Sequence, residues 1–128
     1  AAHCVSVANG TDALELALRA VGVAPGDKVV AVANAGFYGS TAIHDIGAVP
    51  LYADVDEATL TLSPVALEQA LASQPAAVIV THLYGHMADM PALSALCERA
   101  GVPRSVYCTR SRGAVLARRT AGRWGRLG

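Results

Sequence analysis

The chain is poor in aromatic residues, has one lysine, and contains no acidic residue after Glu98. It also lacks any run near the ~20 consecutive apolar residues that a membrane-spanning helix needs. Its N-terminus does not show the basic segment followed by an apolar one that marks a secretory signal. These absences predict a cytoplasmic protein with no membrane partner.

The cysteine pattern argues against disulfide-rich and zinc-ribbon proteins, and the glycine-rich motifs of nucleotide-binding proteins are missing. Cys4, Cys97 and Cys108 are odd in number and far apart, which fits neither a disulfide framework nor a zinc ribbon. We expect reduced and mostly buried thiols. No segment matches a Walker loop or GxGxxG, so neither motif supports a nucleotide-binding fold.

Charge is unevenly distributed along the 128 residues, although the formal net charge is zero. All ten acidic residues lie between Asp12 and Glu98, where Arg19 and Lys28 are the only bases, whereas eight arginines and no acid follow from Arg99 onward. Such a basic tail can bind nucleic acid, but this one has no interleaved aromatic residue apart from Trp124. The acidic remainder would also repel phosphate, so we expect no nucleic-acid partner.

Helical and strand patterns alternate along the chain. With 53% hydrophobic residues and a mean hydropathy of +0.39, it can form a single core that hides roughly two-thirds of its unfolded surface. The alternation predicts an α/β fold with a mostly parallel sheet, helices on both faces, and functional loops at the carboxyl ends of the strands. Strands are expected at 5–8, 29–33, 49–53 and 77–81, and helices at 12–21, 39–46, 64–73 and 91–100. Another strand is due at 102–107, where Arg104 and Ser105 weaken the pattern, because a buried arginine without a partner costs several kcal/mol.

A first candidate site is the turn Asn9–Gly10–Thr11–Asp12 at the start of the first helix. Free backbone N–H groups at a helix start bind phosphate. Gly10 would allow a close approach of the backbone, and the Thr11 hydroxyl could add a hydrogen bond. Alternatively, Asn-Gly is only a turn, and Thr11 or Asp12 only caps the helix.

A second candidate is the aromatic pair Phe37-Tyr38, in a loop of small residues after the strand at 29–33. Small neighbours leave room for a flat ligand, on which an aromatic ring can stack. The alternative is that both rings fill the core.

A third candidate, His82-Leu83-Tyr84-Gly85-His86, follows the strand at 77–81. Its polar groups, His82 and Tyr84 among them, could line the same cleft. His82, His86 and Asp89 could form a metal site, but Gly85 is expected to break the helix that would align the histidines. We therefore predict no metal and a histidine satisfied within the core.

Taken together, four segments in this order and spacing resemble the DegT/DnrJ/EryC1/StrS family of sugar aminotransferases. They are VANGTDALELAL, GDKVVAVANAGFYGSTAI, GAVPLYADVD and VTHLYGHMADM. The resemblance covers nearly the whole chain. It implies a partial large domain of the aspartate-aminotransferase fold, type I, which binds pyridoxal 5'-phosphate.

The resemblance also implies roles for particular residues. It assigns the cofactor phosphate to Gly10, Thr11 and Asp12, mainly through their backbone amides. It assigns stacking on the pyridine ring to Tyr38, which leaves Phe37 as a packing residue. His82 to Gly85 would lie beside the cofactor, without a catalytic step for His82.

The last part of the chain departs from the family. The family has an aspartate, paired with the pyridine nitrogen, where this chain has Tyr107, and a phenol carries no negative charge near pH 7. Arg110 and Arg112 would add positive charge beside the same nitrogen, and Arg126 stands where the family usually has aspartate. The only lysine, Lys28, lies in a turn where the family has no catalytic group, so no catalytic residue is assigned.

We therefore expect residues 1–128 to be a fragment or degenerate copy of an aminotransferase for nucleotide-linked keto-deoxyhexoses. An amino acid would be the donor, and the intact protein would be a homodimer. The N-terminal segment, the catalytic-lysine segment and the C-terminal small domain would be absent, and the chain would be inactive. The alternative is a non-catalytic protein of the same fold that binds cofactor or a partner.

Overall fold

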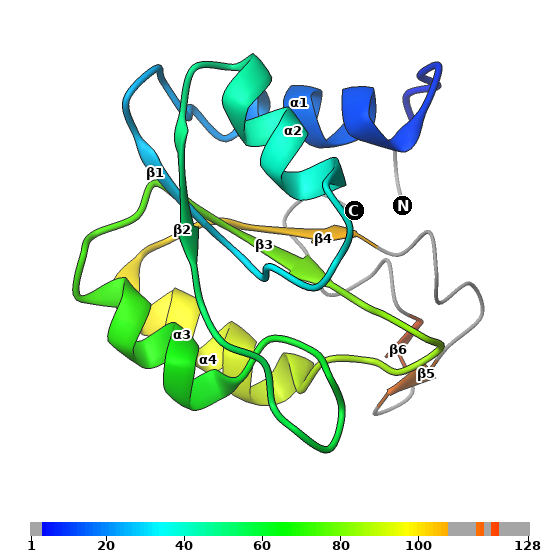
Figure 1. The fold of residues 1–128 in the computed structure, drawn as a ribbon, viewed down its shortest axis with the longest axis vertical. Helices are drawn as coiled ribbons and strands as arrows, with labels where there is room; N and C mark the ends of the chain where they lie inside the picture. The colour runs from blue at the N-terminus through cyan, green and yellow to red at the C-terminus, as the bar shows by residue number, and fades with distance from the viewer. Residues whose placement is uncertain (1–3, 108–114, 117–118, 121–128) are drawn as a thin grey trace.

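A four-stranded parallel sheet forms the centre of the protein (Figure 1). The computed structural model describes residues 4–107, 115–116 and 119–120. The strands lie in the order β2-β1-β3-β4, and all three pairings are parallel. Their bounds are β1 Lys28–Ala31, β2 Val49–Tyr52, β3 Ala77–Thr81 and β4 Arg104–Tyr107, and a separate antiparallel pair comprises β5 Val115–Leu116 and β6 Arg119–Thr120.

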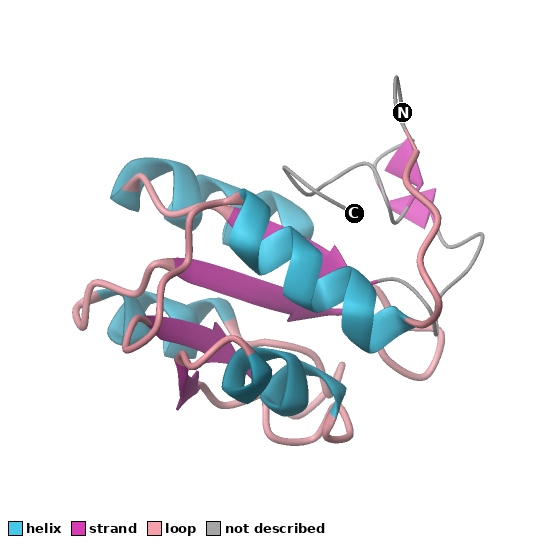
Figure 2. Cartoon of the chain, turned by 90° about the horizontal axis from the view of Figure 1, so that it is seen from above, coloured by secondary structure: helices cyan, strands magenta, loops and turns pink. Residues whose placement is uncertain are grey.

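Four helices cover the sheet in two layers. Helices α1 and α2 lie on one face and α3 and α4 on the other (Figures 1 and 2). This confirms the predicted α/β architecture with helices on both faces. The helices are α1 Gly10–Ala20, α2 Tyr38–Asp45, α3 Pro64–Leu71 and α4 Met90–Ala100.

Local sequence signals set the helix ends. The Ser63 side chain accepts a hydrogen bond from the Ala66 amide, and Pro64 occupies the first turn, where its missing N–H costs nothing. Gly101 ends α4 in the left-handed conformation with φ 67°, which a glycine adopts without steric cost. These are the two helix boundaries that the sequence marks most clearly.

Each face of the sheet has its own hydrophobic core. Because side chains alternate along a strand, Ala77 and Ile79 of β3 pack under α1 and α2, while Val78 and Val80 pack against α3 and α4. All five residues of β3 are buried, as expected for a parallel strand covered on both sides.

Strand β4 forms despite its arginine. The Arg104 side chain is only 16% exposed, and its Nη2 donates a hydrogen bond to Oε1 of Glu98 at 3.2 Å. Glu98, at the end of α4, thus supplies a partner that the strand pattern alone did not reveal. A paired arginine avoids most of the penalty of an uncompensated buried charge.

Two expectations about the first residues were wrong. Residues 5–8 form no strand, and Val5 and Val7 are exposed. A strand needs a neighbour to satisfy its backbone groups, and no strand among the described residues pairs with this segment. Cys4 is also exposed rather than buried, while Cys97 is buried as expected and Cys108 lies outside the described residues.

Among the described residues, no helix has the length and apolarity required to cross a bilayer.

The two described cysteines should differ in reactivity. Burial raises the pKa of the Cys97 thiol, the neighbouring Arg104 lowers it, and Glu98 raises it again. Thiolate is the reactive form, so at pH 8 iodoacetamide should modify exposed Cys4 at least about tenfold faster than Cys97. Peptide mass spectrometry of the native protein measures both rates, and denaturation in urea should abolish the difference. Equal rates in the native state would contradict the buried position of Cys97.

Candidate functional site

The sheet has a topological switch point between β1 and β3. The chain leaves β1 through α2 on one face and leaves β3 through α4 on the other (Figure 1). In open α/β sheets, ligands bind outside the carboxyl ends of the strands at this position. The loops after β1 and β3, which contain the second and third candidate sites, both begin there.

At the start of α1, Asn9 is the helix cap. Its Oδ1 accepts hydrogen bonds from the backbone amides of Thr11 at 2.9 Å and Asp12 at 3.0 Å. These are two of the amides that the resemblance assigns to a phosphate. The sequence alone allows Thr11 or Asp12 as the cap, but Asn9, the residue before the first helical one, performs this role. A phosphate at Thr11 and Asp12 would have to replace the Asn9 oxygen.

The aromatic pair is divided between two environments. Phe37 immediately precedes α2 and is 86% exposed, so the expectation that it packs in the core was wrong. The loop turns at Gly36, with φ 70°, immediately before Phe37 and the start of α2. Tyr38, the first residue of α2, is 40% exposed and faces another aromatic ring.

That second ring belongs to Tyr107, the last residue of β4. The ring centroids of Tyr38 and Tyr107 lie 6.3 Å apart, with planes tilted by 32°. The Tyr107 hydroxyl reaches the first residue of α1, since a Cβ placed on Gly10 would lie only 2.6 Å from it. Gly10 and Tyr38, two of the predicted cofactor-binding residues, therefore meet around Tyr107, which is itself half-buried.

The loop after β3 is a tight turn. Leu83 and His86 exchange two backbone hydrogen bonds, and Tyr84 and Gly85 between them both have positive φ, 54° and 80°. This is the pattern of a type I′ turn, and it confirms that no helix aligns His82 with His86. Tyr84 is 67% exposed at the tip of the turn.

His82 is completely buried at the base of this turn. Its Nδ1 accepts a hydrogen bond from the Ala88 amide at 3.2 Å, so Nδ1 carries no proton. The backbone amide of His82 donates to the carbonyl oxygen of Tyr107 at 3.2 Å. His82 thus fixes the loop beside the site and presents no surface to a cleft. Within the described ranges, no group of three or more His, Cys, Asp or Glu residues could hold a metal ion.

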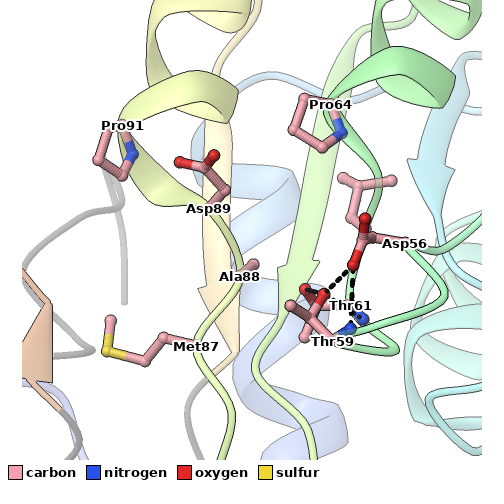
Figure 3. Close-up of a pocket in the computed structure, with 9 residues that line it drawn as sticks. Asp56, Thr59, Thr61, Pro64, Met87, Ala88, Asp89 and Pro91 are labelled. Carbon is pink, nitrogen blue, oxygen red and sulfur yellow. Dashed lines mark hydrogen bonds between the residues drawn. The ribbon is translucent and has the colours of Figure 1, made fainter.

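A separate depression of about 530 Å³ lies by the starts of α3 and α4 (Figure 3). Its carboxylates are already used: Asp56 accepts hydrogen bonds from the amides of Ala58 and Thr59 and from the Thr59 hydroxyl, and Asp89 accepts from the Ala92 amide. They hold the loop and cap the helix. Gly10, Tyr38 and Tyr107 do not line this depression.

The residues around Tyr107 do not accommodate a pyridine ring as they stand. The ring of Tyr107 lies against Tyr38, and its hydroxyl lies against Gly10. Sequence reasoning identified Tyr107 as a departure but missed its contact with Gly10, because no local signal relates a strand end to a distant helix start.

The fold is that of the pyridoxal-phosphate-dependent aminotransferases. The family model described as the DegT/DnrJ/EryC1/StrS aminotransferase family matches residues 1–128. The chain belongs to this family, which confirms the resemblance.

Relatives and solved structures agree with this assignment. The L-glutamine:2-deoxy-scyllo-inosose aminotransferase of Streptomyces lividus is 42% identical over 114 residues, which are 89% of this chain and 27% of that protein. The crystal structure of 3-amino-5-hydroxybenzoic acid synthase superposes with a TM-score of 0.91 at 38% identity, over 95% of this chain and 32% of that one. NtdA from Bacillus subtilis with bound cofactor PMP gives a TM-score of 0.81 at 28% identity, over 88% and 26%. The chain thus spans about a third or less of the length of these proteins.

The cap at the start of α1 can be tested by stability. Asn9→Ala removes the acceptor for two amides and should lower the free energy of unfolding by about 1 kcal/mol. Thr11→Val is the matched control. It removes a hydroxyl that caps nothing and should change stability by less than about 0.5 kcal/mol. Urea denaturation followed by circular dichroism measures both. A larger loss for Thr11→Val than for Asn9→Ala would contradict the structure.

Proposed function

We propose that this chain is a degenerate copy of the segment that forms the cofactor-binding core in pyridoxal-phosphate-dependent aminotransferases, enzymes that aminate a nucleotide-linked keto sugar from an amino acid donor. We also propose that these 128 residues alone do not turn over. The principal support is the meeting of Gly10 and Tyr38 at the carboxyl edge of the sheet, where the family places the phosphate and the ring. The aminotransferase names of the relatives support the same reaction class.

Bound pyridoxal phosphate supplies an electron sink for the carbon that loses its proton. In this chain, the helix dipole at the start of α1 favours a phosphate, which would replace the Asn9 oxygen at the amides of Thr11 and Asp12. Tyr38 offers a stacking surface. Tyr107 occupies the space between the two. None of these residues receives a catalytic role.

The position of Lys28 supports the lack of turnover. It is the only lysine among the 128 residues, it is exposed, and it begins β1. The site lies beyond the carboxyl ends of the strands, whereas Lys28 lies at the amino-terminal end of β1, on the opposite side of the sheet. The amine that the family uses for catalysis is therefore not available from this residue.

A second candidate function is a non-catalytic protein of the same fold that binds cofactor or a partner. The Asn9 cap favours its partner-binding form, since the amides of Thr11 and Asp12 are satisfied without a phosphate. The two proposals differ in one respect. Under the first, this segment can still form part of an active enzyme when the rest of an aminotransferase is supplied.

A chimera tests the difference. In the Streptomyces lividus relative, the segment aligned with residues 4–106 is exchanged for that of this chain, so Tyr107 is left out and the relative's own residues follow. We expect the chimera to bind pyridoxal phosphate, measured by absorbance after gel filtration. It should also aminate 2-deoxy-scyllo-inosose with L-glutamine, at a lower rate than the parent.

Tyr38→Ala in the chimera is the control. Loss of the stacking surface should weaken cofactor binding roughly tenfold, without changing the thermal unfolding of the cofactor-free protein by more than a few degrees. A chimera that unfolds cooperatively but retains no cofactor would contradict the proposal and favour the non-catalytic alternative.

A further inference from the structure

The contacts of Tyr107 point to a function of its own in this site. Its side chain extends from the Tyr38 ring to the first residue of α1, the two places that a cofactor ring and phosphate would contact. We propose that Tyr107 is a plug: its phenol fills the ring position and keeps pyridoxal phosphate out of this chain, and shortening it reopens the position. This inference rests on the proposed function, because it concerns the same site.

The distance between the rings of Tyr38 and Tyr107 leaves no room for a third ring between them. A flat ring between two others needs about 3.5 Å on each side, roughly 7 Å in total. The centroids of Tyr38 and Tyr107 are 6.3 Å apart, and the 32° tilt narrows one side further. The spacing is that of two aromatic rings packed directly on each other. Tyr107 therefore takes the stacking partner's place on Tyr38.

The contact with Gly10 closes the other end. A Cβ built on Gly10 would lie 2.6 Å from the Tyr107 hydroxyl oxygen and 3.1 Å from its Cε2 atom. Only a residue without a side chain permits this approach. The close approach to the Gly10 backbone, which the sequence predicts for a phosphate, is made here by the phenol.

The backbone holds Tyr107 in this position. It pairs with Thr81 in the β3–β4 register, and its carbonyl oxygen accepts the hydrogen bond from the amide of buried His82. The side chain packs against the apolar cluster under α1 and α2. Packing against this cluster therefore holds the ring in place together with the backbone contacts.

In this proposal, the size of the side chain at position 107, and not its charge, excludes pyridoxal phosphate. A shorter side chain at position 107 would end before Tyr38 and Gly10, whether it is charged or not. Tyr107→Leu keeps an apolar contact with the cluster and removes the outer half of the phenol. Tyr107→Asp is also short but adds a carboxylate, and Tyr107→Phe keeps the ring beside Tyr38.

Equilibrium dialysis of the 128-residue chain against pyridoxamine 5'-phosphate tests the proposal. This probe has no aldehyde and cannot react with Lys28. We expect Tyr107→Leu and Tyr107→Asp to bind it about tenfold or more tightly than the unsubstituted chain, the factor of a stacking contact. Tyr107→Phe should bind as weakly as the original. Tyr52→Leu, the same kind of substitution at the end of β2, is the matched control: it removes a hydrogen bond to Ser40 of α2 but no contact with Tyr38 or Gly10, and should leave binding unchanged.

Each other result overturns the plug. Binding by Tyr107→Asp but not by a folded Tyr107→Leu would show that charge, not size, limits binding. Tight binding by Tyr107→Phe or by the original chain would show that the ring does not obstruct the cofactor position. If the chimera that ends at Val106 binds cofactor while Tyr107→Leu and Tyr107→Asp do not, the plug fails and the proposed function stands. If the chimera also fails, both fail.

A double-mutant cycle tests the geometry without any ligand, and so remains informative if a variant is poorly stable. Gly10→Ala should lower the melting temperature by about 4 °C or more when Tyr107 is present, because the new methyl group meets the hydroxyl. In the Tyr107→Leu background, Gly10→Ala should leave the melting temperature unchanged or raise it. Equal effects in both backgrounds would show that Tyr107 does not reach Gly10.

Discussion

The burial of β3 on both of its faces is the constraint from which the remaining structure follows. All five residues of this strand are buried, so each face must be covered by apolar side chains from helices. A parallel strand also needs a crossover to its neighbour, and the crossover helices provide that cover. The two hydrophobic cores are therefore consequences of one requirement, and both depend on the run of small and branched residues at 77–81.

The same constraint places the site. Parallel strands end at one edge, so the loops after β1 and β3 and the end of β4 are brought together irrespective of their separation in sequence. Helix α1 packs on the face covered by α2, which brings Gly10 to the edge where Tyr38 and Tyr107 lie. A helix start, a loop and a strand end thus form one small constellation. Its geometry depends on the sheet, not on local sequence.

Sequence reasoning succeeded where the determinant is local. The AVIVT strand, the Ser63-Pro64 helix start and the Gly101 helix end are all as predicted, because each depends on a few adjacent residues. It failed for Val5 to Ala8, where an apolar run predicts a strand but no described neighbour pairs with it. It failed for Phe37 because apolarity indicates burial only if the chain can direct the ring inward. The Arg104–Glu98 pair and the contact of Tyr107 with Gly10 could not be predicted either, since both depend on how whole elements pack.

Position 107 sets two requirements against each other. A tyrosine here buries apolar ring surface against the cluster under α1 and α2, which stabilises the cofactor-free fold at about 25 cal/mol per Å² of apolar surface. A carboxylate would lose that contact and, when no cation is bound nearby, would carry the cost of a poorly solvated charge. The carboxylate becomes favourable only when a cofactor brings a positive partner. A tyrosine that stabilises the empty site therefore also closes it, so stability without cofactor and affinity for cofactor are opposed at this strand end.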